Sequence, residues 1–571
     1  MTKTMMRNVG LAVGGLLVLV GCSTEHYRKS ADKQAAAVIA EKSPAVPNMD
    51  PKFTIATNGP VSLDGLPVNT QVEEFLGPYG ESERDAPILS LEKSLGIAVK
   101  HSRLYQSNKE QLYLAALSLT LSRHQFAPLF SAGGRANYAV DTQRILELVP
   151  DPDNPGQSIP LLSDRLVEEH RVSASGSVGV DWLIRDVGRI SAAFTTDFLR
   201  FLTGDPRTMT SSRVGATFAR PLLRNSGYKA EVESLTQAER DVFYELRDFV
   251  RFRKDFSVQI ATAYYGVLRD RDTVRNSHLS LQNFKRTAER TRALAREGRT
   301  TQSDLGRLEQ EELSTESTWI NAVRAYKRSL DDFKIQLGIP VETRLLLDDR
   351  DLEQLKIQHT EISVEDSIKV ALAARLDYQN LREQHEDAQR KVKLAADRLK
   401  AQLDFLASAS FDSVEQSHGF PLPDPDRYRW NAGVDLNLPL ERKAERNAYR
   451  SALISLDRSA RTLEQRRDEI ELQVRESHRT LEQARRTYEI SEIGVKLAER
   501  RVEEQELLAQ LGRAKAQDQV DTQKSLVDSK NQRTLALVGH TIARLQFWNN
   551  MGILYIKDNG QWEEINDAKS K

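Results

Sequence analysis

The sequence contains a single cysteine, Cys22, in 571 residues, so no disulfide framework can stabilise its fold. Beyond the N-terminal segment it has no apolar run long enough for a transmembrane helix, which leaves strands as the only route through a membrane. Its 81 basic and 82 acidic residues nearly cancel, and nucleic-acid binding would need a basic excess. We therefore expect no nucleic-acid partner.

The sequence also lacks the common patterns of catalytic and cofactor sites. Its ten histidines are scattered, with no HExxH pair and no His/Cys cluster. There is no phosphate-binding glycine loop and no G-x-S-x-G motif. The many carboxylates lie in amphipathic segments, where they are typical of solvated helix faces. The sequence therefore predicts no catalytic residue, no metal ligand and no cofactor.

The N-terminus has the pattern of a targeting segment. Lys3 and Arg7 precede the short apolar stretch 11–20, which ends in the letters LVGC at Cys22. This pattern is similar to a bacterial lipobox, in which cleavage before the cysteine leaves a thiol to be acylated. The alternative is an ordinary signal peptide with an incidental cysteine. Ser23, in place of Asp, resembles the pattern of lipoproteins sent to the outer membrane.

Residues 22–87 are rich in Pro, Gly and Asp and show no hydrophobic periodicity, which predicts a disordered tether. From residue 88 onward the chain repeats itself. Each copy reads as a helix, strands, a very long helix and a returning helix. The long helices are expected at roughly 227–297 and 441–511, each about 105 Å long at 1.5 Å per residue. Helices of this length need a partner along their whole seam, as in an antiparallel coiled coil.

Several short segments alternate in the way a barrel wall requires. In 130–140, 171–180 and 405–411, apolar residues alternate with Ser, Arg, Asn or Gly. A soluble, half-buried sheet would alternate too. The stretch 181–212 has no counterpart in the second copy, and an extra hairpin, a long loop or irregular wall are all compatible with it.

The number of strands predicts a shared barrel. A sheet that spans a bilayer must close completely, because lipid offers no partner to an open edge. Known single-chain barrels begin at eight strands, and this sequence offers about four to six by its alternating pattern. The barrel is therefore expected to form between subunits.

These features together resemble the TolC-like outer-membrane efflux family, in its lipoprotein form. The resemblance covers most of 88–555 and depends on the duplication, on the strand-to-helix junctions ARPLLR (219–224) and LNLPLER (436–442), on ARLDYQ (374–379) and on two glycine turns. It implies a homotrimer with a twelve-stranded or slightly larger β-barrel that continues into a periplasmic α-helical tunnel. It also implies export of drugs, small molecules or proteins, with a periplasmic adaptor and an inner-membrane transporter as partners.

The resemblance assigns roles to particular residues. Asp518 and Asp521 lie six and nine residues after Gly512, where the family narrows its tunnel with acidic rings, although such a pair can also be a solvated helix face. The family's gating arginine is replaced by Ala514, with Arg513 and Lys515 beside it. Pro221 and Pro439 are expected to mark the passage from strand to helix. The expected adaptor contacts at the tips are Gly298, Ser303, Asp304, Leu305, Gly512 and Gln517.

The predicted fold class is mainly α with a membrane β-barrel. The expected function is a trimeric outer-membrane channel that extends into the periplasm; the alternative is a structural coiled-coil envelope lipoprotein without channel activity. The expected divisions are a signal peptide (1–21), the tether after a lipidated Cys22 (22–87), a first repeat (88–340, strands near 126–140 and 170–222), a connection (341–362), a second repeat (363–555, strands near 403–413 and 428–440) and a tail (556–571).

Overall fold

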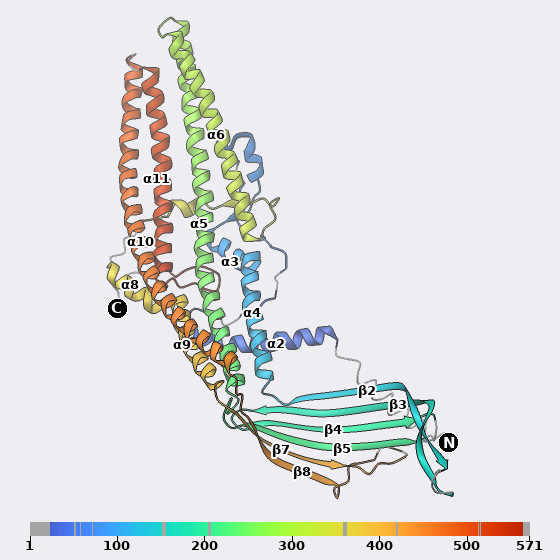
Figure 1. Cartoon of the computed structure of the whole chain (residues 1–571). Helices are drawn as coiled ribbons and strands as arrows, with labels where there is room; N and C mark the ends of the chain where they lie inside the picture. Colours follow the sequence, from blue (N-terminus) through green and yellow to red (C-terminus); the bar gives the residue numbers. More distant parts are fainter. Residues whose placement is uncertain are drawn as a thin grey trace. The chain divides into compact units, whose positions relative to one another are not determined.

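The structure is a computed structural model that describes residues 23–50, 53–56, 59–70, 72–150, 156–203, 207–357, 362–417, 419, 421–511, 513 and 515–563. These residues divide into two compact units (Figure 1). The helical unit takes in 1–116, 241–385 and 459–571, and the sheet unit takes in 117–240 and 386–458. Within the described residues, no helix is both long and apolar enough to cross a bilayer.

The elements alternate between short helices, strands and two very long helices, as the duplication predicted. The long helices α5 (Lys229–Arg296) and α10 (Lys443–Gln510) each have 68 residues. The sequence therefore located both to within a few residues. The remaining helices are α2 (Thr24–Lys42), α3 (Leu91–His101), α4 (Arg103–His124), α6 (Gln302–Leu337), α7 (Arg350–Glu353), α8 (Val364–Ala374), α9 (Leu376–Asp397) and α11 (Ala516–Asn550), with the 3-10 turns η1 (Ser43–Ala45) and η2 (Glu74–Glu83).

The same local signals start corresponding helices in both repeats. Ser90 accepts a hydrogen bond from the backbone N–H of Lys93 and begins α3, and Ser363 accepts one from Asp366 N–H and begins α8. A serine in this position satisfies one of the free N–H groups of a helix start. The two-residue strands β1 (Ile88–Leu89) and β6 (Leu346–Leu347) pair in parallel, and so join the start of the first repeat to the connection between repeats.

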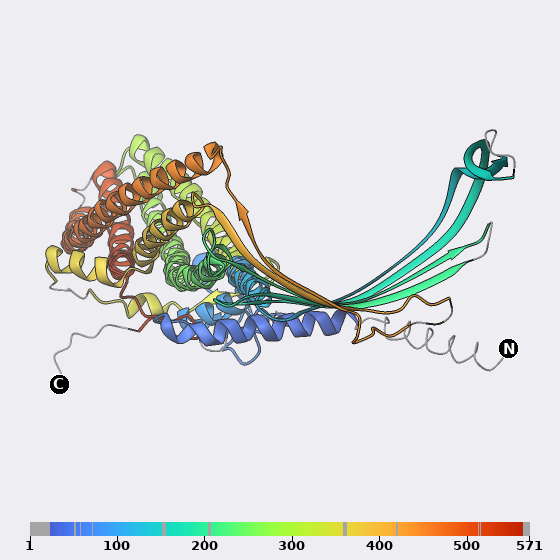
Figure 2. The same ribbon diagram turned by 60° about the horizontal axis from the view of Figure 1, so that its bottom comes forward.

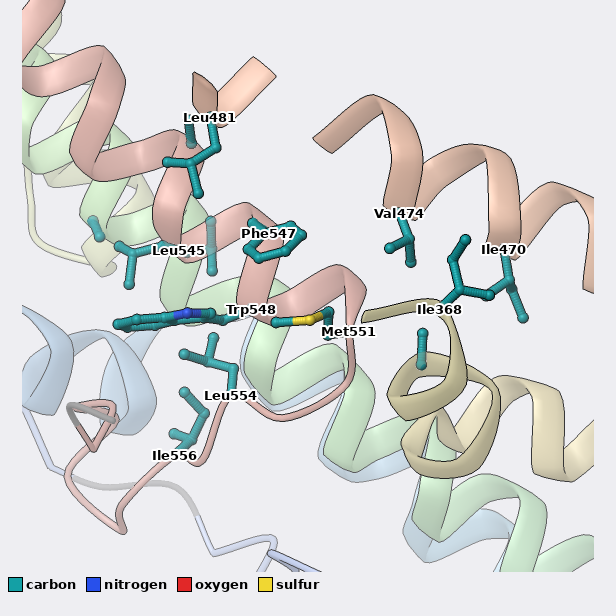
Figure 3. Packing of buried hydrophobic residues seen from close by; sticks show 14 residues of the cluster. Ile368, Ile470, Val474, Leu481, Leu545, Phe547, Trp548, Met551, Leu554 and Ile556 are labelled. Carbon is teal, nitrogen blue, oxygen red and sulfur yellow. The ribbon is translucent and has the colours of Figure 1, made fainter. Parts of the chain in front are cut away.

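A hydrophobic core ties the second helical hairpin to the rest of the helical unit (Figure 3). Trp548 of α11 and Met551, directly after this helix, pack in one buried cluster with Val474 of α10 and Ile368 of α8. Val258 of α5 belongs to the same cluster. Burying apolar side chains of this size contributes about 1.5–3 kcal/mol each. The core is therefore built from both repeats.

The sheet unit holds one six-stranded antiparallel sheet in the order β2-β3-β4-β5-β7-β8, which curves without closing (Figure 2). The first repeat supplies four strands and the second supplies two. The described residues of the unmatched stretch 181–212 form the end of β3, all of β4 and the start of β5, so this stretch belongs to the sheet. The strands are β2 (Leu129–Pro150), β3 (Ser158–Ile184), β4 (Gly188–Phe201), β5 (Thr208–Pro221), β7 (Gln402–Asp412) and β8 (Tyr428–Asn437).

The predicted disordered tether is wrong for much of 23–87. Helix α2 buries Ala35, Val38 and Ile39 against the helical unit. The hydroxyl of Tyr113 in α4 donates to the Asp32 carboxylate at 2.6 Å. The prediction failed because the partners of this segment lie far away in the sequence, where local composition gives no sign of them.

The second part of the same segment is held by a buried ionic cluster. Glu83 pairs with Arg271 of α5 at 3.0 Å and accepts a hydrogen bond from the Tyr326 hydroxyl of α6 at 2.6 Å. The indole N–H of Trp319 donates to the carbonyl oxygen of Phe75 at 2.8 Å. Burial is the first cause that raises the pKa of Tyr326, so this hydroxyl remains a donor. The segment therefore binds both helices of the first hairpin.

Candidate functional site

One face of the six-stranded sheet is apolar from edge to edge. The pairing keeps side-chain alternation in register through all six strands, because no residue is inserted in the part that the six strands share. Many of these apolar side chains are exposed, with Phe130 at 83% and Trp430 at 72%. One row across this face consists of Ala132, Val178, Phe194, Val214, Phe411 and Tyr428.

The opposite face is polar and carries ion pairs between neighbouring strands. Arg213 of β5 and Arg429 of β8 both pair with Asp412 of β7, each at 2.5 Å. The Asp181 carboxylate accepts a hydrogen bond from Ser191 at 2.7 Å. This face therefore suits water, while the other suits an apolar surrounding.

The height of the apolar face matches a bilayer. On β7 it extends from Leu403 to Phe411, which is about 21 Å for a strand tilted by about 40°. Bilayer-spanning strands show an apolar band of about 25 Å with aromatic girdles. Aromatic rings lie at both ends: Phe218 and Phe405 are 6.2 Å apart at one end, and Tyr428 is exposed at the other.

Both predicted junction prolines lie where strand changes to helix. Pro221 is the last residue of β5, and Pro439 follows β8 by two residues. Neither opens a helix, since α5 and α10 start several residues later. Asn225 bridges the first gap: its side chain accepts a hydrogen bond from Ala230 N–H at 2.8 Å, at the start of α5. The prolines therefore end strands, where their missing N–H has no ladder partner to lose.

The tip of the first hairpin is a glycine turn followed by a capped helix. Gly298 has φ +72° and ends α5. Thr301 caps α6, because its hydroxyl oxygen accepts a hydrogen bond from Asp304 N–H at 3.1 Å and its hydroxyl donates to the Asp304 carboxylate at 2.6 Å. Ser303 and Leu305 lie in the same first turn of α6. Asp304 therefore contributes to capping.

The tip of the second hairpin places its two aspartates differently. Asp518 and Asp521 are exposed in the first turns of α11, while Ala516 and Val520 face a buried cluster. Asp518 occupies the same third helical position as Asp304, but the residue before the helix is Lys515, which makes no side-chain capping bond. The Gln517 amide donates to Asp521 at 3.0 Å. Both carboxylates therefore lie at the helix surface.

A groove of about 380 Å³ separates the tips of the two hairpins. Its walls come from α5 and α6 on one side and from α10 and α11 on the other, and polar side chains dominate its lining. Arg286, Arg290 and Arg299 lie on one wall, and Glu506 lies on the facing wall. Gln517 contacts Arg307 of the other hairpin through a hydrogen bond. The tips therefore present a polar groove with charges of both signs.

Some predicted positions are outside the described residues: Cys22, Gly512 and Ala514. The described part of the chain shows no group of three or more His, Cys, Asp or Glu side chains arranged to hold a metal ion. The segment ARLDYQ holds a feature that its sequence does not reveal: Asp377 pairs with Arg375, Arg251 of α5 and Arg466 of α10 and so forms an ionic hub. Two of these partners lie far away in the sequence, so the local motif gives no sign of them.

Comparison with known proteins gives the fold. No family model matches the sequence, and no curated protein matches it either. Among solved structures, the outer membrane protein VceC of Vibrio cholerae is similar with a TM-score of 0.58 and 14% identity, over 81% of this chain and 96% of that one. The CmeC outer membrane channel of Campylobacter jejuni is similar with a TM-score of 0.58 and 12% identity, over 90% of this chain and 96% of that one.

The MtrE outer membrane channel of Neisseria gonorrhoeae, solved in its open state, is similar over 81% of this chain and 89% of that one, with a TM-score of 0.57 and 12% identity. The chain has the outer-membrane channel fold. The predicted fold class, mainly helical with a sheet domain, is thereby confirmed. The outer-membrane channel fold accounts for both the two-faced sheet and the paired long helices.

Proposed function

We propose that this protein is a trimeric outer-membrane channel that extends into the periplasm and exports molecules delivered by an inner-membrane transporter through a periplasmic adaptor. The two-faced sheet is the observation that carries the proposal. An apolar band of bilayer height on one face and ion pairs on the other are what a membrane wall around an aqueous pore requires. A structural envelope spacer, the alternative, has no need of such a wall.

The sheet must be completed by other copies. The six strands of one chain do not close, and lipid cannot satisfy an open edge. A trimer is the arrangement that the resemblance to TolC-like channels implies. Native mass measurement in detergent tests it directly: a stable trimer is expected, and a monomer with intact sheet signature would contradict it.

The N-terminal Cys22 is proposed to carry a lipid that adds to membrane attachment without being needed for the channel. The exposed apolar side chains of the sheet support the expectation that the sheet can anchor the protein in the membrane without the lipid. Replacing Cys22 with Ala behind a cleavable signal should leave assembled trimers in the outer membrane. If membrane insertion were lost completely, the lipid and not the sheet would be the main attachment.

At the helical tips we propose a constriction lined by Asp518 and Asp521 from each copy. In a trimer the two residues supply six carboxylates, and rings of like charge in a narrow pore favour cations. The turn residues Gly298, Ser303, Leu305 and Gly512, together with Asp304 and Gln517 near the groove, are proposed to contact the adaptor. The groove between the hairpins supports this role by its position and its mixed charge.

Conductance of the purified protein in planar bilayers tests the function. Wild-type protein should conduct and prefer cations, whereas a spacer lipoprotein should not conduct. Asp518→Asn with Asp521→Asn should weaken cation preference and block by trivalent cations. Glu503→Gln with Glu504→Gln is the matched control, because both glutamates are exposed on α10 before the turn. Equal selectivity in all three proteins would place Asp518 and Asp521 outside the pore.

A further inference from the structure

The two repeats contribute unequal shares of one continuous wall. Between α4 and α5 the chain makes four strands, and between α9 and α10 it makes two. The two added strands are inserted in the plane of the sheet, because β3 pairs with β2 and β4 pairs with β5. Their side chains continue the apolar and polar faces of the sheet, with Val178 and Phe194 on the apolar face and Ser177 on the polar face. The added hairpin is therefore wall, and not a plug or a loop.

The sheet ends in two strands whose outer edges have no neighbour in the described chain, β2 and β8. All ten residues of β8 are exposed. Because strand direction alternates through the antiparallel order, β2 and β8 run in opposite directions. The β8 edge of one copy can thus join the β2 edge of another as an ordinary antiparallel pair, with the apolar faces continuous.

We propose that β8 of each copy pairs with β2 of the next copy, so that three copies of the six-stranded sheet close an eighteen-stranded barrel in place of the family's twelve-stranded one. The strand that pairs with each edge strand therefore comes from another copy of this chain. The strand total depends on the trimer proposed above, whereas the edge pairing does not. At equal tilt of about 40°, eighteen strands enclose a backbone diameter of about 36 Å and twelve enclose about 24 Å.

The geometry of closure also limits the register between copies to a few values. Strands tilted by about 35–45° and spaced by about 4.8 Å shift by about 6–8 residues across six strands. The shift must be even, since an odd one would exchange the two faces. Without any shift, the observed pairings bring Asn431 level with Leu129, and β8 beyond Asn431 would meet no strand.

A shift of six or eight removes this mismatch. At six, Tyr428 lies opposite Tyr138 and Asn437 lies opposite Leu129, so the whole of β8 finds a partner on β2. At eight, Tyr428 lies opposite Val140 and pairing is again complete. At either shift, the part of β2 beyond Val140 lies outside the pairing with β8 and pairs only with β3 of its own chain.

Disulfide trapping in the full-length protein tests both parts of the proposal. Residues opposite each other on antiparallel strands lie within disulfide reach. Asn431→Cys is combined with Arg135→Cys for the six-residue shift, or with Asn137→Cys for the eight-residue shift. Asn431→Cys with Leu129→Cys is the control, because these residues share the polar face but are level only without a shift. Each variant that carries only one of these substitutions is checked for wild-type conductance.

One of the two shifted pairs should give covalent species that stop at the trimer on denaturing gels, and the control pair should give none. Species that stop at a dimer would keep the edge pairing but overturn the eighteen strands. Trimers by native mass without any cross-link in the shifted pairs would overturn the edge pairing and leave the proposed function standing. Monomers without conductance would instead remove the proposed function.

Discussion

The two repeats share a backbone arrangement but use different side chains to hold it. In each, a short helix breaks before a longer one, at Ser102 between α3 and α4 and at Arg375 between α8 and α9. A glycine with φ +78° lies against each break, Gly338 in the first repeat and Gly552 in the second. The backbone approach is so close that a Cβ on Gly338 would lie 2.1 Å from the carbonyl oxygen of His101.

Around the same break the two repeats differ in chemistry. In the second repeat, Asp377 accepts hydrogen bonds from Arg375 and from Arg466 of α10, at 2.8 and 2.7 Å, and pairs with Arg251 of α5 at 2.5 Å. In the first repeat, the corresponding region uses Tyr105, which is 5.2–5.8 Å from three phenylalanine rings of α5. Duplication thus preserved the close backbone contact, and the packing around it diverged into an ionic hub and an aromatic cluster.

The largest difference should come from breaking the ionic hub. Asp377→Asn leaves three arginines without their shared carboxylate, and removing one partner of a buried pair costs about 3–5 kcal/mol. Unfolding of the detergent-solubilised protein, followed by circular dichroism, measures the loss. The control is Glu365→Gln, an exposed carboxylate on α8, which should stay within about 0.5 kcal/mol of wild type. Equal stability of both variants would show that the hub is not a stabilising centre.

Acid should act on the ionic hub of the second repeat and not on the aromatic cluster around Tyr105 in the first. Burial alone would raise the pKa of Asp377, but the hydrogen bond from Arg375 and the nearby charges of Arg251 and Arg375 hold it well below its usual range. Its contribution is present above about pH 4, the unfolded pKa, and is lost as pH falls toward the folded pKa. Burial raises the pKa of Tyr105 to about 12, so it stays neutral in acid.

Unfolding measured at pH 7 and near pH 3 should therefore show a smaller drop in stability for Asp377→Asn than for wild type. An unchanged drop would assign the acid sensitivity to other carboxylates.

The two close-approach glycines should differ in their tolerance of alanine. Alanine at a left-handed position costs about 1–2 kcal/mol, and Gly338→Ala adds an overlap with backbone atoms that no side chain can relieve. At Gly552 the added Cβ meets the Ala374 carbonyl at 3.2 Å, a milder contact. Gly298→Ala is the control for backbone strain alone, because nothing lies within 4 Å of its added Cβ. The expected order of destabilisation is Gly338, Gly552, Gly298, and a different order would contradict the overlap argument.

The smallest expected effect concerns the two tip aspartates. Asp304→Asn disturbs a capped helix start, which is worth about 1 kcal/mol, and should speed amide hydrogen exchange in the first turn of α6. Asp518→Asn has no capping side chain to lose and should leave exchange in α11 nearly unchanged, while it changes ion selectivity. Fast exchange in α11 with unchanged selectivity would reverse the two assignments.

Regular patterns in the sequence predicted the long elements well. Alternation predicted the strands at Phe130–Val140 and Phe405–Phe411, and the glycine after α5 predicted the hairpin turn. The added hairpin was left open because Asp197 and Arg200 fall on opposite faces of β4, so the alternation fails toward its outer end. The alternation within one strand does not show which other strands lie beside it in the sheet.

The candidate site was less predictable for a different reason. The exposed positions of Asp518 and Asp521 fit a helix surface in one chain, and the proposed ring of carboxylates requires several copies. Docking of the N-terminal segment depends on Glu83 meeting Arg271 and on Phe75 meeting Trp319, contacts that span 188 and 244 residues of sequence. Local composition carries no trace of such partners.

The Asn48 side chain makes a contact that bears on the order of folding. Its amide donates to the carbonyl oxygen of Ile556 at 2.6 Å, and its oxygen accepts a hydrogen bond from Ile556 N–H at 2.8 Å. The two partners are 508 residues apart. Loop closure over such a distance is slow, and chains emerge from their N-terminus first. These two hydrogen bonds can therefore form only after residue 556, beyond the end of α11, has been synthesised, so the N-terminal segment docks at this point late in folding.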